Sequence, residues 1–220
     1  MYFIGDMKDK FTPEIVLGSG CEGKVYYNEK TQEAVKVHFS ENNSKYKSLD
    51  EKDASSLCNL PTENILLPRR IVYDENGLYK GYTTTYIPTS RYIDDIDVER
   101  YKIKDLIKIL SKLYKDVQVI SNNGLCLSDL CSDGNYIFNG LYYLIDPGLY
   151  YFSDKDLKEI LKENIKRLNI FINYTIMWNR IEGLQEQLLE RGSNYTICDY
   201  LKDEANEEET LIGLIRRKIK

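Results

Sequence analysis

The sequence predicts an α+β fold made of two lobes, with mainly strands in residues 1–87 and mainly helices in residues 88–220. Before Pro88, short apolar runs alternate with glycines and turn residues, which is typical of an antiparallel sheet. After Val98, apolar residues recur at helical intervals. The 220 residues suffice for one domain or for two small lobes that share a cleft.

In the first lobe we expect a five-stranded antiparallel sheet and one helix. The apolar spacing of residues 44–60 predicts the helix, and Pro61 ends it. Residues 75–77 have the composition of a hairpin turn. The strand-like segments are residues 15–17, 24–27, 33–37, 65–67, 70–73 and 79–87.

The second lobe opens with a long amphipathic helix, predicted for residues 98–120. A loop follows up to Asn135. Asn139 and Gly140 then separate two apolar runs and predict a two-residue hairpin turn in which both residues have positive φ. From Ser153 onward the pattern is helical, and we expect these helices to complete the second lobe.

Composition excludes several classes of protein. No apolar run approaches the roughly 18 residues of a membrane span, and none follows the charged N-terminus, so we expect a cytoplasmic chain without a membrane partner. His38 is the only histidine, which excludes a histidine metal cluster and a Ser-His-Asp triad. The net charge of -5 argues against nucleic acid as a partner. The five cysteines have no metal-site spacing and are expected to be reduced.

A glycine-rich segment, residues 18–23, lies between two predicted strands. Gly18, Gly20 and Gly23 would let the backbone approach a phosphate group and donate N–H groups to it. A plain glycine-rich turn explains the same residues. Because the segment joins two strands and lacks a following GKS or GKT, it favours neither a Rossmann site nor a P-loop.

Lys36 closes the next predicted strand and could reach the phosphate oxygens under the glycine-rich segment. Ala34, two residues earlier, would leave room for an adenine ring. A solvated lysine at a strand end is the alternative.

The second lobe carries candidate oxygen ligands around its predicted hairpin. Asp129 and Asn135 belong to an aspartate loop, residues 127–135, and Asp146 follows the hairpin. Because a hairpin brings its two ends together, Asn135 and Asp146 should be adjacent, and their oxygen atoms suit magnesium. Each aspartate could instead be a loop cap or a turn residue.

In their order along the chain, these motifs resemble the signature set of the protein kinase family over roughly two-thirds of the chain. The glycine-rich segment with Val25 resembles the GxGxxGxV loop, and Lys36 resembles the lysine of VAIK. The other matches are Asp129 with the catalytic-loop aspartate, Asn135 with the metal-binding asparagine, and Asp146 and Gly148 with the DFG motif.

The resemblance implies a two-lobed, protein-kinase-like fold and an ATP- and Mg²⁺-dependent phosphotransferase. It implies that Asp129 is the catalytic base, that Glu51 holds Lys36, and that Asn135 and Asp146 bind magnesium. The nucleotide-binding residues that it implies are Leu17, Gly18, Ser19, Gly20, Gly23, Val25, Ala34, Lys36, Thr84 and Tyr86. Two alternatives stay open: Asp53 in place of Glu51, and Asp133 in place of Asp129, because the loop has one residue more than the family pattern.

Several positions depart from the family pattern. Leu127 and Ser128 stand where the family has histidine and arginine, which argues against control by activation-loop phosphorylation. Pro147 replaces the phenylalanine of DFG. No APE motif follows Tyr150, and the second lobe is abbreviated.

The acceptor is therefore the least determined part of the function. A Ser, Thr or Tyr hydroxyl of a protein is the leading expectation. A small-molecule acceptor, as in aminoglycoside and choline kinases, is the second. A pseudokinase that binds nucleotide as an interaction module is the third, although the chain retains Lys36, Asp129, Asn135 and Asp146. Another ATP chemistry, such as nucleotidyl transfer, completes the alternatives.

Overall fold

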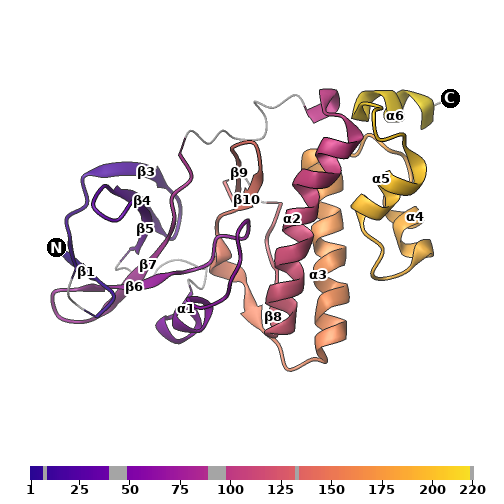
Figure 1. Ribbon diagram of the computed structural model, residues 1–220. Coiled ribbons are helices and arrows are strands. Elements are labelled where there is room, and N and C mark those ends of the chain that lie inside the picture. The colour runs from indigo at the N-terminus through magenta and orange to yellow at the C-terminus, as the bar shows by residue number, and fades with distance from the viewer. Residues whose placement is uncertain (7–8, 40–48, 89–97, 132–133, 219–220) are drawn as a thin grey trace. The chain divides into compact units, whose positions relative to one another are not determined.

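The computed structural model describes residues 1–6, 9–39, 49–88, 98–131 and 134–218, and it shows an α+β chain (Figure 1). The chain divides into two compact units. Unit 1 comprises Met1–Leu60, Leu66–Pro88 and Pro147–Leu149. Unit 2 comprises Pro61–Ile65, Thr89–Asp146 and Tyr150–Lys220.

Unit 1 is built on a curled antiparallel sheet (Figure 1). Its strands are β1 (Tyr2–Ile4), β2 (Asp9–Phe11), β3 (Ile15–Ser19), β4 (Gly23–Asn28), β5 (Glu33–His38), β6 (Arg70–Asp74) and β7 (Tyr79–Thr85). They follow the order β2-β1-β6-β7-β5-β4-β3. The last five strands lie in predicted segments, whereas β1 and β2 were not predicted. Residues 65–67 were expected to form a strand, but they contribute only an isolated bridge between Ile65 and Leu144.

One face of this sheet carries the hydrophobic core of unit 1. Val35 and Val37 project from β5 into a cluster with residues of neighbouring strands, because alternate residues of a strand share a face. This core cluster consists of Ile4, Phe11, Val35, Val37 and Val72. Burying these side chains leaves Ala34 and Lys36, which alternate with them, on the other face.

Helix α1 (Glu51–Leu57) packs on that other face. Asp50 caps the helix by accepting the Asp53 N–H at 2.9 Å, which fixes its start. The Tyr79 hydroxyl donates to the Leu49 carbonyl at 2.9 Å, and the Tyr79 ring contacts His38, which shares a face with Lys36. The helix predicted over residues 44–60 is too long at both ends, because residues 49–50 and 58–60 are not helical; residues 44–48 lie outside the described residues.

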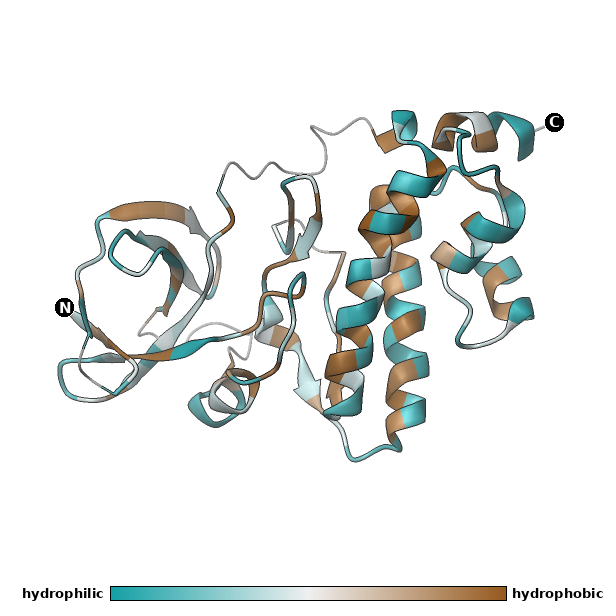
Figure 2. Ribbon diagram, viewed as in Figure 1, coloured by the Kyte–Doolittle hydropathy of each residue, from teal (hydrophilic) through white to brown (hydrophobic). Residues whose placement is uncertain are grey.

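Unit 2 is mainly helical. Its two long helices, α2 (Ile103–Asn122) and α3 (Leu157–Phe171), lie side by side, and hydrophobic and hydrophilic residues alternate along both ribbons (Figure 2). The remaining helices are the 3₁₀ turn η2 (Val98–Arg100), the π-helix η4 (Ile172–Ile176), α4 (Leu184–Arg191), α5 (Ile197–Glu204) and α6 (Leu211–Lys218). Within the described part of the chain, no helix is both long and apolar enough to span a bilayer.

Two short antiparallel pairs complete unit 2. Strands β9 (Tyr136–Phe138) and β10 (Tyr142–Leu144) form the predicted hairpin. Its loop has three residues, not two, because Phe138 pairs with Tyr142. Gly140 has a φ of 72°, but Asn139 does not have a positive φ, so the turn expected from Asn-Gly is wrong in detail. The second pair, β8 (Leu125–Cys126) with β11 (Tyr151–Phe152), was not predicted.

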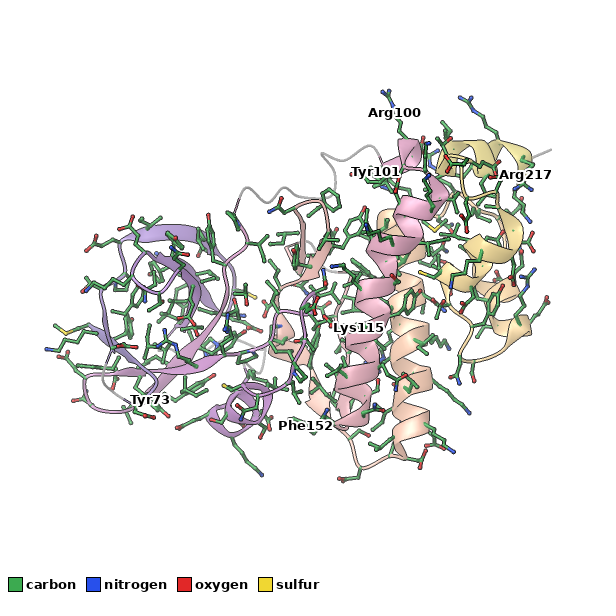
Figure 3. All side chains as sticks on the ribbon, viewed as in Figure 1. Tyr73, Arg100, Tyr101, Lys115, Phe152 and Arg217 are labelled. Carbon is green, nitrogen blue, oxygen red and sulfur yellow. The ribbon has the colours of Figure 1, made fainter. Side chains whose placement is uncertain are left out.

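The C-terminal helices are fastened to the start of α2 by backbone and charge contacts. The Ile103 N–H donates to the Glu209 carbonyl, and Glu208 accepts from Lys102 at 2.7 Å and from Lys104. Arg217, on α6, pairs with Glu209 at 3.0 Å (Figure 3). The contacts of Lys102, Ile103 and Lys104 with Glu208 and Glu209 join segments that lie about a hundred residues apart in the sequence.

After η4 the backbone adopts a left-handed conformation, which residues other than glycine rarely adopt. Trp178 and Asn179 have φ values of 55° and 50°, in the left-handed region. Trp178 is the only tryptophan of the chain, and 50% of it is exposed.

Candidate active site

The glycine-rich segment comprises the end of β3, the turn at residues 20–22 and the first residue of β4, and its glycines have different surroundings. At Gly23 the backbone approaches β5 so closely that a Cβ would lie 2.2 Å from the Val37 carbonyl oxygen. At Gly18 and Gly20 a Cβ would meet nothing within 4 Å. Strand packing therefore explains the glycine at position 23, and the open space at Gly18 and Gly20 leaves room for a ligand.

Strand pairing brings four predicted nucleotide-binding residues onto one face of the sheet. Val25 lies opposite Lys36, and Ala34 lies opposite Thr84. Opposed residues, and residues two apart on a strand, point to the same side. All four side chains therefore lie on the face away from the core cluster.

Lys36 is buried, and its charge is paired with the glycine-rich segment. The residue is 9% exposed, and its Nζ lies 2.9 Å from Oε2 of Glu22. Sequence reasoning missed Glu22. The signal that could have found it was the carboxylate itself, because a negative charge is unfavourable in a segment predicted to bind phosphate.

The other predicted partner residues lie on α1. Glu51 is exposed and accepts a hydrogen bond from the Tyr73 hydroxyl at 2.8 Å (Figure 3). Asp53, the alternative, follows it within the first turn. The pairing of Lys36 with Glu51 stays a prediction.

Of the remaining predicted nucleotide-binding residues, two lie on the edge strand β3 and one follows the central strand β7. Leu17 and Ser19, on β3, are exposed. Tyr86 lies just after β7, and its ring packs on Tyr27 with centroids 4.4 Å apart. Since Tyr27 pairs with Ala34, this aromatic contact lies beside the face that carries Lys36.

In unit 2, Asp129 has a strained backbone and a direct contact with Asn135. Its φ is 51°, a value that costs free energy in a residue with a side chain. The Asn135 side chain donates to the Asp129 carbonyl at 2.6 Å and to its carboxylate at 3.2 Å. The structure therefore brings the predicted base and one predicted metal ligand together. Asp133 lies outside the described residues, so this alternative stays open.

Helix α3 holds the chain immediately before Asp129. The Asn164 side chain accepts the Leu127 N–H and donates to the Leu125 carbonyl and the Ser121 hydroxyl, each at 2.8 Å. Arg167 donates to the Leu127 carbonyl. Asn164 is fully buried, so these bonds are shielded from water. Sequence reasoning identified neither residue, because each acts on a segment about forty positions earlier.

The hairpin places the backbones of Asn135 and Asp146 close to one another, as predicted. The Ile145 N–H donates to the Asn135 carbonyl at 2.9 Å, so the residue before Asp146 pairs directly with Asn135. Gly148, of the predicted metal motif, lies in a 3₁₀ turn, η3 (Pro147–Leu149).

A buried carboxylate on α2 holds the segment that is hydrogen-bonded to strand β10 of this hairpin. Asp116 is 2% exposed and accepts the N–H groups of Glu63, Asn64 and Ile65 at 3.0, 2.5 and 2.8 Å. The Asn64 carbonyl accepts the Leu144 N–H at 2.9 Å. Burial raises the pKa of Asp116, although the three N–H donors act in the opposite direction. Asp116 thus positions residues 63–65, which in turn hold β10.

The donor atoms of Asn135 and Asp146 fit magnesium in kind. An amide oxygen and a carboxylate oxygen are hard ligands, and phosphate and water oxygens would fill the other positions around the ion. Among the described residues, no group of three or more His, Cys, Asp or Glu side chains forms a metal cluster.

In comparisons with known proteins, neither a family model nor a curated protein sequence matches this chain.

Proposed function

We propose that this protein is an ATP- and magnesium-dependent phosphotransferase with a two-lobed, protein-kinase-like fold, and that it phosphorylates a Ser, Thr or Tyr hydroxyl of a protein. The observation that carries the proposal is the contact between Lys36 and the glycine-rich segment. A buried cation lies 2.9 Å from a side chain of a turn that has open space at two glycines. Such a cation and such a turn could bind the same phosphate group.

Unit 1 supplies the nucleotide-binding groups in this proposal. The backbone N–H groups of the glycine-rich segment and Lys36 bind the phosphates. Val25 and Ala34 contact the adenine ring, since they share the Lys36 face of the sheet. Thr84 and Tyr86, at the end of β7, offer backbone groups to the edge of the adenine.

Unit 2 supplies the base and the metal ligands. Asp129 orients the acceptor hydroxyl and takes its proton. Its strained backbone supports this role, because strain persists where surrounding contacts such as those of Asn164 and Arg167 impose it. Asn135 and Asp146 would hold magnesium, whose charge stabilises the phosphate oxygens when it is bound.

The test is incubation with γ-labelled ATP, Mg²⁺ and a panel of acceptors. We expect label on protein or peptide hydroxyls. Label on small alcohols alone would indicate a small-molecule kinase. Nucleotide binding without turnover would indicate a pseudokinase.

The decisive variant is Lys36→Met. Loss of this charge should lower the rate by about 10²–10³-fold, the usual effect of losing one electrostatic donor in an active site. Lys30→Met is the matched control, because Lys30 is exposed in the turn before β5. Full turnover in a folded Lys36→Met protein would contradict the proposal.

A further inference from the structure

The glycine-rich segment contains Glu22, whose negative charge would repel the phosphate group that the segment is proposed to bind. The side chain of Glu22 is 11% exposed and that of Lys36 is 10% exposed, so their ion pair is largely withdrawn from water. A buried lysine needs a counter-charge, because an unpaired charge in the interior is costly. Glu22 supplies a counter-charge to Lys36 at 2.9 Å.

The position of Glu22 allows its side chain to move away from Lys36 while the strands of the sheet stay paired. Residues 20–22 lie between β3 and β4 and outside both strands. The last pair of the β3–β4 ladder is Ser19 with Lys24, and Gly23 pairs with His38 of β5. The Glu22 carbonyl is held by the Phe39 N–H at 3.0 Å, so the backbone stays attached to the end of β5. Only the side-chain contact with Lys36 has to break.

A carboxylate and a phosphate cannot both occupy the position next to Lys36. Each carries negative charge and accepts hydrogen bonds from the same ammonium group. The phosphate chain of ATP carries more charge than one carboxylate, so it can displace Glu22, but the free energy of the lost ion pair is subtracted from its binding.

We propose that Glu22 occupies the phosphate position in the nucleotide-free protein and that the nucleotide binds by taking Lys36 from it. This inference rests on the proposed function and adds a residue to the nucleotide site. Glu22 lowers nucleotide affinity and keeps Lys36 paired when no nucleotide is bound.

The test compares ATP binding by the wild-type protein and Glu22→Gln in calorimetric titrations, with and without Mg²⁺. Glutamine keeps the size of the side chain and loses the charge, so we expect ATP to bind about tenfold more tightly. Tripolyphosphate should show the same gain, because the effect concerns phosphate. Adenosine should bind both proteins equally. Glu29→Gln is the matched control, since Glu29 is exposed in the turn after β4, and its ATP affinity should stay unchanged.

A second variant covers the case in which Glu22→Gln fails to fold because the ion pair between Glu22 and Lys36 is lost. Glu22→Asp keeps the charge on a shorter side chain and should bind ATP with a smaller gain. Circular dichroism checks the fold of both variants.

The outcomes separate this inference from the proposed function. Unchanged or weaker ATP binding in both Glu22 variants, beside lost binding in Lys36→Met, would overturn the inference and leave the function standing. If no variant and no wild-type sample binds ATP or tripolyphosphate, both are wrong. Tighter binding of ATP and tripolyphosphate, but not of adenosine, would support both.

Discussion

At Gly23, β4 passes so close to β5 that a Cβ would lie 2.2 Å from a backbone oxygen, whereas at Gly20 there is open space. Gly23→Ala should therefore destabilise the protein by more than about 1 kcal/mol, because the backbone has to move. Gly20→Ala should fold normally and bind ATP about tenfold more weakly, because a methyl group would block one N–H bond to a phosphate. Urea unfolding and ATP titration of both variants check this pair.

Normal ATP binding by a folded Gly20→Ala protein would remove this residue from the site. Equal stability of Gly23→Ala and the wild type would contradict the close approach of the two strands.

Asp129 and Asp133 can be told apart by their effects on the chemical step. Asp129→Asn should lower kcat by about 10²–10⁴-fold, the usual effect of losing a general base, while ATP affinity stays close to that of the wild type. Asp133→Asn should cost little. Single-turnover transfer and ATP binding are the measurements. An inactive Asp133→Asn protein beside an active Asp129→Asn protein would reverse the assignment.

The sequence identified residues whose chemistry is local and missed those that act at a distance. Lys36, Asp129 and Asn135 stand in short motifs, and the structure puts the latter two in contact. Asn164 bonds to Leu127, 37 residues earlier, and Asp116 bonds to Asn64, 52 residues earlier. No local pattern specifies such contacts, because packing of the elements creates them.

Among the elements, the long helices and the hairpin were predicted, whereas the other strands of two or three residues were not. Helices α2 and α3 each bury a continuous apolar stripe, which periodicity detects. Strands β1 and β2 have three residues each, too few for an alternating pattern, and β8 and β11 have two. The hairpin was predicted from its apolar runs and from the Asn139–Gly140 pair, but the conformation of Asn139 depends on the register of β9 and β10.

The attachment of α3 to the aspartate loop predicts a specific loss of stability. Asn164→Ala would leave the Leu127 N–H and the Leu125 carbonyl buried without their partner. An unpaired buried polar group costs about 1–3 kcal/mol, so the free energy of unfolding should fall by at least about 2 kcal/mol. Asn122→Ala, at an exposed position on α2, should change it by less than about 0.5 kcal/mol. Urea unfolding distinguishes the two, and equal effects would count against the buried network.

The ion pairs between the start of α2 and the turn before α6 predict that the stability of the folded protein depends on pH in the acidic range. Hydrogen bonds from Lys102 and then Lys104 lower the pKa of Glu208 from 4.5 to about 2. A lowered pKa adds stability above pH 4.5, and this contribution is lost as the pH falls toward about 2. Glu208→Gln should lack this part of the acid sensitivity. High salt should reduce this acid sensitivity in the wild type, because Glu208 is exposed and its ion pairs are screened.

Thermal unfolding midpoints of both proteins across this pH range, at low and high salt, provide the measurement. Parallel pH profiles for the two proteins would show that Glu208 contributes nothing.

At the scale of the molecule, the division into a strand-rich part and a helix-rich part follows from composition, but the path of the chain between the units does not. Pro61–Ile65 belongs to unit 2, although strands of unit 1 precede and follow it. The physical reason is Asp116, which holds three consecutive N–H groups of this segment. The sequence does not reveal that this aspartate, in the middle of a helix, binds the backbone of a distant segment.

The packing of α3 on α2 predicts that unit 2 cannot fold without its C-terminal part. A chain truncated after Tyr150 would lack α3 and expose the apolar side chains of α2, including Leu110, Leu113 and Val117. It would also lack Asn164 and Arg167. We expect the truncated chain to lose cooperative unfolding and to expose hydrophobic surface to the dye ANS. A single sharp thermal transition with normal ATP binding would contradict this expectation.

The solitary Trp178 gives the molecule a built-in optical reporter. It lies in unit 2, half exposed, beyond the π-helix. The fluorescence of Trp178, excited at a wavelength that only indole absorbs, therefore reports the unfolding of unit 2. Unit 1 contains no tryptophan, and its strands contribute to the far-ultraviolet circular dichroism. Fluorescence and far-ultraviolet dichroism recorded on one sample would trace the two units separately, and ATP would move the two curves by different amounts if they melt independently.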